Sequence, residues 1–275
     1  MQSPMETVVC QSVRVSQACR SVSVRNRKVV AIIPAAGQGV RMGSYKKQFL
    51  KLDGVPILIH TLRKFVACPE VTEIFLATPK GDIGEIRKMG EDLGKRVTVV
   101  EGGNRRQDSV ENCLHAVPSD TDLVAVHDAV RPFISPALIS AVIGEATQTG
   151  AAILGILTVD TVKQVDRKRI LGTIPRERII LAQTPQVFRY EILKRAFDKA
   201  HEDGFQGTDE ASLVEHLGLE ITVVRGSDRN IKITNPADLE LARFFLEEER
   251  HSLGEPTLPS IELPTQRRSK ARSDG

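Results

Sequence analysis

Hydrophobic residues between positions 29 and 159 occur in short continuous runs, which alternate with longer amphipathic stretches. A continuous apolar run of this length is typical of a strand that is buried on both faces of a sheet. The runs predict strands at 29–34, 73–79, 96–100, 122–128 and 151–159. The stretches between them predict helices near 56–67, 82–93, 108–117 and 135–149. This alternation indicates an α/β fold with a doubly wound, mostly parallel sheet.

The pattern changes at residues 160–181, where charged and apolar residues alternate loosely without a helical period. We expect an extended hairpin, a β-arm that projects from the sheet and leaves an edge for a partner. Beyond it, the pattern predicts helices near 190–202 and 209–217 and a strand at 220–225. A closing helix is expected to start with Asn235 as N-cap and Pro236 at its first position.

The two ends of the chain differ in composition from the rest. Residues 1–28 are rich in Ser, Val and Arg and lack the apolar core of a secretory signal, so we expect a disordered N-terminal extension. An organellar transit peptide is the alternative. Residues 254–275 contain three prolines and predict a disordered C-terminal tail. The expected globular domain is therefore 29–253.

Charge and composition exclude several classes of function. The net charge of +3 belongs to the ends, because residues 29–253 carry 29 Lys and Arg against 31 Asp and Glu. With no Trp and two Tyr, the chain offers no aromatic platform for nucleic acid. No apolar run is long enough to span a membrane. The four cysteines lack metal-ligand spacing and indicate reduced thiols in a cytoplasmic protein.

A glycine-rich turn follows the first predicted strand. Its glycines are Gly37, Gly39 and Gly43. Met42 breaks the dinucleotide fingerprint, and no P-loop sequence is present. Arg41 and Lys47 follow the turn, so residues 34–47 combine free backbone N–H groups with two cations, which suits a nucleoside triphosphate. The alternative is an ordinary glycine turn with solvated basic residues.

The sequence HDAVRPF places a carboxylate at the end of a central predicted strand. Asp128 suits Mg²⁺, which takes one or two carboxylates and completes its shell with water and phosphate oxygens. Arg131 follows three residues later. The alternative is that Asp128 only caps the following turn. His127 is interpreted as a hydrogen-bonded structural residue rather than a general base.

Seven motifs together resemble one enzyme family. PAAGQGVRM, GGNRRQDSV, HDAVRPF, DTVK, TPQVF, TDEAS and NIKIT stand in the order and spacing of the 2-C-methyl-D-erythritol 4-phosphate cytidylyltransferases of the non-mevalonate route to isoprenoids. The resemblance covers about residues 29–250 and implies a Rossmann-like nucleotidyltransferase fold. It also implies Mg²⁺-assisted transfer of CMP from CTP to 2-C-methyl-D-erythritol 4-phosphate. The products would be 4-diphosphocytidyl-2-C-methyl-D-erythritol and pyrophosphate.

The resemblance also implies roles for individual residues. Contacts to CTP are expected from Ala35, Ala36, Gly37, Gly39, Gly103, Asn104 and Ser109. Catalytic charge is expected from Arg41, Lys47 and Arg176, the metal ligand is Asp128, and acceptor contacts are Arg131, Thr161, Thr208 and Lys232. Thr161 and Arg176 match residues that the family's arm delivers to a neighbouring subunit, so the resemblance implies a homodimer.

Three positions depart from the family pattern. Asn104 stands where related enzymes often carry Asp, Lys46 where Pro is common, and Arg229 where an acid is frequent. A ribitol-5-phosphate cytidylyltransferase and a UTP- or GTP-dependent sugar-phosphate transferase are alternatives within enzymes. A non-catalytic nucleotide-sensing domain is the alternative of another class. Such a domain is expected to lose Lys47, Arg41 or Asp128, and all three are present.

Overall fold

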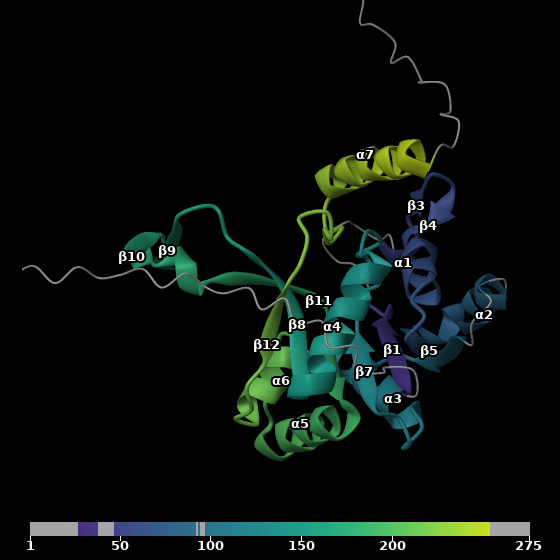
Figure 1. Cartoon of the computed structure of the whole chain (residues 1–275), viewed down its shortest axis with the longest axis horizontal. Helices are drawn as coiled ribbons and strands as arrows, with labels where there is room; N and C mark the ends of the chain where they lie inside the picture. Colours follow the sequence, from purple (N-terminus) through teal and green to yellow (C-terminus); the bar gives the residue numbers. More distant parts are fainter. Residues whose placement is uncertain (1–26, 38–46, 92, 94–96, 254–275) are drawn as a thin grey trace, which may run out of the picture.

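A seven-stranded sheet forms the centre of the molecule in the computed structural model, which describes residues 27–37, 47–91, 93 and 97–253 (Figure 1). The strand order is β12-β8-β11-β7-β1-β5-β6. The strands are β1 Val29–Pro34, β5 Val71–Thr78, β6 Val97–Glu101, β7 Leu123–Val126, β8 Ala151–Leu157, β11 Ile180–Arg189 and β12 Thr222–Arg225. The predicted α/β fold with a mostly parallel sheet is therefore confirmed.

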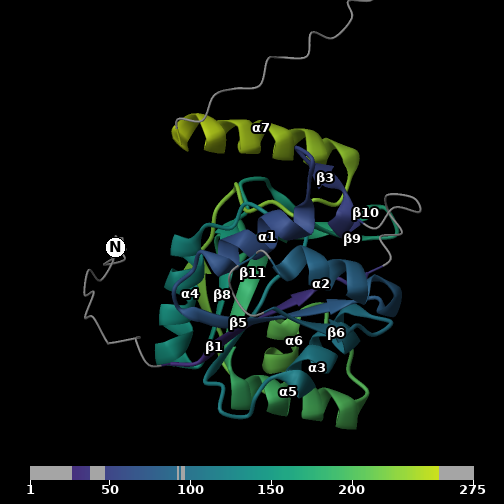
Figure 2. The same ribbon diagram turned by 90° about the vertical axis from the view of Figure 1, so that its right-hand side faces the viewer.

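Helices cover both faces of this sheet (Figure 2). One hydrophobic core lies between the sheet and α1 Ile57–Val66, α2 Ile83–Glu91 and α4 Pro136–Thr149. A second core lies between the other face and α3 Arg106–Ala116, α5 Tyr190–Asp203 and α6 Glu210–His216. Two-sided burial explains why β1 and β7 are continuous apolar runs rather than alternating ones.

One strand of the sheet, β11, was not predicted from the sequence. β11 pairs antiparallel with both β7 and β8, whereas the other neighbours in the sheet are parallel. No strand was predicted at 182–189, because Pro185 interrupts the run and proline usually argues against a central strand. The register shifts between Gln183 and Gln186, which accommodates the proline within the ladder.

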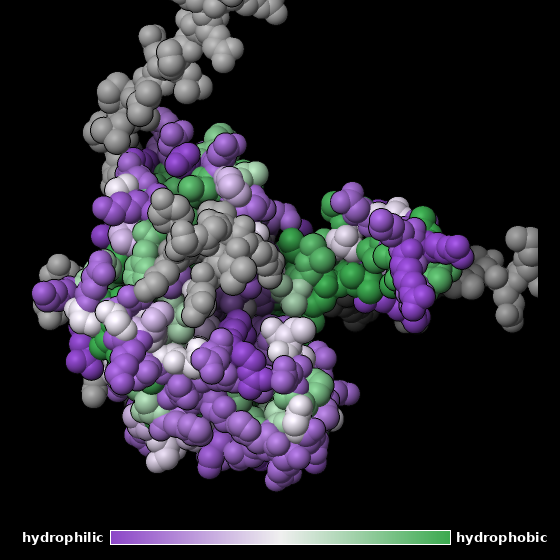
Figure 3. Space-filling model, turned by 180° about the vertical axis from the view of Figure 1, so that it is seen from behind, coloured by the Kyte–Doolittle hydropathy of each residue, from purple (hydrophilic) through white to green (hydrophobic). Residues whose placement is uncertain are grey.

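The predicted β-arm is present between β8 and β11. It consists of the hairpin β9 Val162–Asp166 and β10 Arg169–Ile174, followed by the short helix η3 Arg176–Arg178. Figure 1 shows the hairpin far from the helices that cover the sheet. Apolar side chains are exposed along the arm and the strand ends that carry it (Figure 3): Leu157, Val159, Val165, Ile170, Leu171 and Leu181.

A third, small core lies under the closing helix, α7 Pro236–Leu253. The predicted N-cap is confirmed, since the Asp238 amide donates to Asn235 Oδ1 at 3.0 Å. Here α7 packs on the segment that follows the glycine-rich loop, which contains η1 Lys47–Phe49, β3 Lys51–Leu52 and β4 Val55–Pro56. The remaining short helix, η2 Lys80–Asp82, precedes α2.

The predictions for the two ends of the chain fall mostly outside the described residues, since 1–26 and 254–275 are not described. Lys28, at the end of the expected extension, already belongs to the fold. Its amide donates to Asp122 Oδ2 at 2.8 Å and its ammonium contacts Asp120 Oδ1 at 2.7 Å. Within the described part of the chain, no helix combines the length and apolarity that crossing a membrane requires.

Candidate active site

A cleft lies at the carboxyl ends of β1 and β7, where ligands bind in doubly wound sheets. It brings together segments that are distant in the sequence: the glycine turn, the start of α3, the HDAVRPF turn and the loop before α7. The described residues lining it are Pro34, Ala35, Ala36, Gly37, Gln48, Arg106, Ser109, Asp128, Ala129, Val130 and Lys232. Six residues expected from the sequence to form the site therefore lie around one cleft.

Two hydrogen bonds to the backbone of Ala35 fix the glycine turn. The Ala35 amide donates to Ala77 O at 2.7 Å, and buried Gln48 donates through Nε2 to Ala35 O at 2.7 Å. Gly102 presses against this turn, because a Cβ at position 102 would stand 2.2 Å from the Ala36 Cβ. Any larger residue at 102 would push the two segments apart. The glycine is needed for this close approach.

The loop between β6 and α3 and the first turn of α3 carry the other residues expected at the nucleotide. Ser109 is buried, and its hydroxyl accepts from the Gly103 amide at 3.1 Å and donates to Arg105 O at 3.0 Å. Gly103 also packs closely, since a Cβ there would stand 2.3 Å from the Asp108 Cβ. Asn104 is exposed at the outer end of the loop. Ser109 therefore shapes the loop from which Asn104 reaches solvent.

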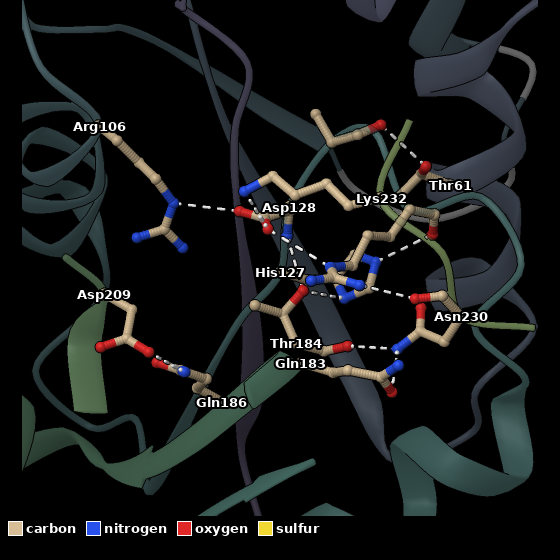
Figure 4. Close-up of polar contacts among 12 residues, drawn as sticks. Thr61, Arg106, His127, Asp128, Gln183, Thr184, Gln186, Asp209, Asn230 and Lys232 are labelled. Atoms are coloured by element: carbon tan, nitrogen blue, oxygen red, sulfur yellow. Dashed lines mark hydrogen bonds and ion pairs between the residues drawn. The ribbon is translucent and has the colours of Figure 1, made fainter. Parts of the chain in front are cut away.

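Asp128 is the electrostatic centre of the cleft (Figure 4). Although it is only 7% exposed, its carboxylate contacts three cations. Oδ1 accepts from Arg106 Nε at 3.1 Å, while Oδ2 contacts Lys232 Nζ at 2.9 Å and Arg131 Nε at 3.4 Å. Burial by itself raises the pKa of Asp128, but the three cations outweigh it and hold this pKa well below its usual range. Asp128 is therefore a carboxylate that stays ionised.

Arg106 links Asp128 to a second buried acid. Its guanidinium donates through Nη1 and Nη2 to the two carboxylate oxygens of Glu210, at 2.8 and 2.9 Å. Burial lowers the pKa of Arg106, but the two acids outweigh it and raise this pKa above its ordinary value. Sequence reasoning missed this pair, although Arg106 lies in GGNRRQDSV and Glu210 in TDEAS. The buried positions of the two charges were the missing information.

Arg106 also lines a second, adjoining cleft, together with Thr208 and Gly207. Gln186 of β11 holds the loop that carries Thr208. Its side chain donates to Asp209 Oδ2 at 2.7 Å and accepts from the Ala211 amide at 2.9 Å. The strand that was not predicted thus positions one of the expected acceptor residues.

His127 is a structural residue, as the sequence indicated. It is fully buried and packs against Phe65, with ring centroids 4.9 Å apart. Nδ1 lies 3.0 Å from Thr184 Oγ1, and Nε2 lies 3.1 Å from Arg131 O. Burial lowers the pKa of His127 to about 4. A neutral imidazole without access to the cleft cannot act as a general base on a substrate.

Two expected residues lie on or beside the arm instead of at this cleft. Thr161 is exposed just before β9. Arg176 is exposed in η3, and its Nη1 donates to Val159 O at 2.7 Å. Gly39 and Arg41 lie outside the described residues, and Lys47 is described only as the first residue of η1.

The donor set of the cleft can be compared with the needs of a divalent cation. No group of three or more His, Cys, Asp and Glu side chains within the described ranges could hold a metal by itself. Asp128 Oδ1 accepts one hydrogen bond and keeps a lone pair free. One carboxylate beside a glycine-rich turn fits Mg²⁺, which keeps several waters and binds substrate phosphates.

Comparison with known proteins agrees with this geometry. Residues 29–248 match the family model described as 2-C-methyl-D-erythritol 4-phosphate cytidylyltransferase. An enzyme of that name from Solibacter usitatus is 55% identical over 236 residues, covering 81% of this chain and 97% of that protein. One from Acidobacterium capsulatum is 52% identical over 232 residues, covering 80% and 97%.

Solved structures agree as well. The 4-diphosphocytidyl-2C-methyl-D-erythritol synthase of Anaerococcus prevotii superposes with a TM-score of 0.72 at 30% identity, covering 80% of this chain and 98% of that one. The 2-C-methyl-D-erythritol 4-phosphate cytidylyltransferase of Francisella tularensis has a TM-score of 0.68 at 36% identity, covering 79% and 99%. This chain therefore belongs to the 2-C-methyl-D-erythritol 4-phosphate cytidylyltransferase family.

Proposed function

We propose that this chain transfers CMP from CTP to 2-C-methyl-D-erythritol 4-phosphate. An oxygen of the acceptor phosphate forms a bond to the α-phosphorus of CTP. The bond from that phosphorus to the β-phosphate bridge breaks in line, and pyrophosphate leaves. The observation that carries this proposal is the single cleft that joins the glycine turn at 34–37 to Asp128 and Lys232, in a chain of this family.

The donor half of the site is the glycine turn together with the loop before α3. Backbone groups of Ala35, Ala36, Gly37 and Gly39 are proposed to surround the triphosphate, with Gly103, Asn104 and Ser109 at the cytosine and ribose. The close packing of Gly102 on Ala36 supports one joint surface. Arg41 and Lys47 are proposed to stabilise charge in the transition state, where fixed donors have their largest effect.

Asp128 would hold Mg²⁺ beside the triphosphate. The cation would supply charge neutralisation for the phosphates when bound. Arg106, Lys232 and Arg131 contact the same carboxylate. Each of these cations reaches the carboxylate from a different segment of the chain, so the orientation of Asp128 is set by the fold.

The acceptor half combines residues from two subunits in our proposal. Arg131, Lys232 and Thr208 of one chain would meet Thr161 and Arg176 of the arm of a second copy. The two arm residues are exposed, and the hairpin of β9 and β10, which lies between them in the sequence, projects from the body of the chain (Figure 1). The exposed apolar side chains of the arm support a homodimer, since burying them would supply the free energy of association.

The chemistry needs no strong general base. A phosphate monoester is an anion at neutral pH, so the burden falls on positioning and charge neutralisation. His127, the neighbour of Asp128 in the sequence, does not offer a general base to the cleft. It is buried and hydrogen-bonded at both nitrogens. Arg106, Arg131 and Lys232 supply positive charge around the site.

We place the reaction in the bacterial cytoplasm, or in a plastid should residues 1–28 be a transit peptide. The free thiol of Cys113 and the bacterial relatives support the first location. Separate assays with two candidate acceptor substrates test this function. The protein is incubated with CTP and Mg²⁺ plus either 2-C-methyl-D-erythritol 4-phosphate or ribitol 5-phosphate, and pyrophosphate release is followed.

We expect release with the methylerythritol phosphate and a rate at least roughly a hundredfold lower with the ribitol phosphate. A preference for ribitol 5-phosphate would transfer the proposal to that enzyme class. UTP and GTP in place of CTP serve as nucleotide controls. No release with either acceptor, from protein that binds CTP, would favour a nucleotide-sensing domain.

A further inference from the structure

The HDAVRPF turn is held by a buried hydrogen-bond relay that no part of the proposed reaction uses. We propose that His127 and Thr184 are positioning residues, which fix Asp128 and Arg131 through one defined tautomer of the imidazole, with its proton on Nε2. This inference rests on the roles proposed for Asp128 and Arg131. It concerns how those two residues keep their orientation relative to each other.

The hydroxyl of Thr184 forms one end of the relay. The Asp128 amide donates to Thr184 Oγ1 at 3.1 Å, so the hydroxyl oxygen acts as an acceptor there. Its proton is then free to point at His127 Nδ1, 3.0 Å away. An Nδ1 that accepts this bond carries no proton. The bond from the Asp128 amide is therefore compatible with an imidazole that is unprotonated at Nδ1.

The carbonyl of Arg131 forms the other end and sets the position of the imidazole proton. It lies 3.1 Å from His127 Nε2, and a carbonyl can only accept, so Nε2 must carry the proton. His127 is 0% exposed and Phe65 packs against its ring, so water does not compete for either nitrogen. The Arg131 carbonyl thus requires the proton on Nε2, and in the neutral imidazole this leaves Nδ1 to accept from Thr184.

Further hydrogen bonds close the relay into a ring (Figure 4). Arg131 Nη1 donates to Asn230 O at 2.6 Å, and Asn230 Nδ2 donates to Thr184 O at 2.9 Å. The path runs from Thr184 through His127 to Arg131 and returns through Asn230. It connects β11 to the ends of the HDAVRPF turn and to the segment that carries Lys232.

The backbone of the same turn is satisfied by other elements. Thr61 of α1 donates to Ala129 O at 2.9 Å, and the Ile233 amide donates to Val130 O at 3.0 Å. These bonds hold the middle of the turn, whereas His127 and Thr184 hold its two ends. Removing the relay is therefore expected to tilt Asp128 and Arg131 without unfolding the sheet around them.

Four variants separate the two bonds of the imidazole. His127→Gln keeps a donor near Nε2 and loses the acceptor for Thr184, while His127→Asn keeps an acceptor near Nδ1 and loses the donor to Arg131. Thr184→Val removes the hydroxyl, and Thr184→Ser restores it. We expect kcat to fall roughly ten- to a hundredfold in the first three, as for a misplacement of about 1 Å. Thr184→Ser should stay within about threefold of wild type.

His60→Gln is the matched control. His60 is partly buried, and its Nε2, like that of His127, lies close to a backbone carbonyl, that of Leu52 at 2.9 Å. This variant should lower Tm with kcat unchanged. The kcat of each variant is expressed per folded molecule, and KM for CTP is measured alongside. We expect KM for CTP to change less than about threefold, because most proposed CTP contacts come from other segments.

The wild-type protein provides a readout that is independent of activity. Long-range ¹H–¹⁵N NMR spectra of the imidazoles are expected to show one buried histidine as the neutral Nε2–H tautomer, with its signals lost in His127→Asn. An Nδ1–H tautomer at His127 would overturn the proposal. So would kcat per folded molecule within twofold of wild type in both His127→Gln and Thr184→Val.

Folding failure and failure of the proposed site give different results. If His127→Gln does not fold, the comparison of Thr184→Val with Thr184→Ser and the NMR spectrum of the wild-type protein still test the proposal. Should Asp128→Asn keep full activity, the proposed site itself is wrong, whatever the tautomer. A loss of activity in Asp128→Asn with none in His127→Gln and Thr184→Val would refute the relay alone.

Discussion

Asp128 and Val159 stand at two extremes of this molecule. Asp128 is 7% exposed, and cations from three separate segments surround its carboxylate. Val159, at the base of the arm, is 80% exposed, and Leu157 beside it is 68% exposed. The first region is polar and buried within one chain, whereas the second is apolar and uncovered.

The difference shows which part of the site one chain can complete. Charges at Asp128 are compensated within the chain, because an unpaired buried charge would cost several kcal/mol. Apolar groups on the arm lose their hydration cost only when another surface covers them. The proposed metal and nucleotide half therefore preexists in the monomer, and the proposed arm contribution depends on association.

The largest expected effect is that of replacing Asp128 in the cleft. Asp128→Asn should lower kcat on the order of a thousandfold, as for loss of a preorganised electrostatic group. The measurement is steady-state pyrophosphate release, with Tm recorded because three cations lose one charged partner. Asp198→Asn, at an exposed position on α5, is the control and should match wild type. Near-normal turnover of Asp128→Asn would refute its proposed role.

The next effect tests whether the arm serves another chain. Arg176→Ala and Lys47→Ala should each lower turnover roughly a hundredfold or more. Mixed after exchange of subunits, they should recover about a quarter of wild-type turnover, because half of the dimers contain one intact site. Recovery is measured against each variant alone. No recovery in verified mixed dimers would mean that Lys47 and Arg176 of one chain serve the same site.

A smaller effect concerns the apolar face of the arm. Ile170→Asp, at a position 65% exposed, should weaken dimerisation by about 2 kcal/mol, roughly thirtyfold in Kd. Sedimentation velocity over a concentration series measures it. Leu241→Asp on α7, at a position 42% exposed, is the control for an apolar site elsewhere. Equal weakening by both substitutions would show that the arm is not the dimer contact.

The smallest effect comes from a departure from the family pattern. Arg229 contacts Glu248 and lies over the Phe245 ring, 5.1 Å from its centroid, so it ties the loop before Lys232 to α7. Arg229 itself is exposed, so Arg229→Ala should cost about 1 kcal/mol or less. We expect KM for the acceptor to rise up to about fivefold. Glu240→Ala, on the exposed side of α7, is the control.

Local patterns predicted much of the fold. Buried runs identified β1, β5, β6, β7 and β8, and the cap at Asn235 identified the start of α7. β11 was missed, because Pro185 suggests a loop when only neighbouring residues are considered. In the sheet β11 lies between β8 and β7 as the return strand of the arm, which no local pattern reveals.

The candidate site divides in the same way. Asp128 and Lys232 could be selected from their motifs, and the structure places them in contact. Glu210 gave no such signal, because it becomes informative only when Arg106 meets it from 104 residues away. Thr184 and Gln186 were likewise not selected, since their partners lie on other elements.

The sequence by itself determined the fold class, the family and the chemical groups available to the reaction. These follow from patterns of neighbouring residues and from motifs that each lie within one segment. The tertiary structure alone decided which groups are paired. Hydrogen bonds and buried ion pairs depend on distances between segments far apart in the chain. The fold makes Asp128 an ionised centre, makes His127 a buried link rather than a base, and leaves the apolar arm exposed.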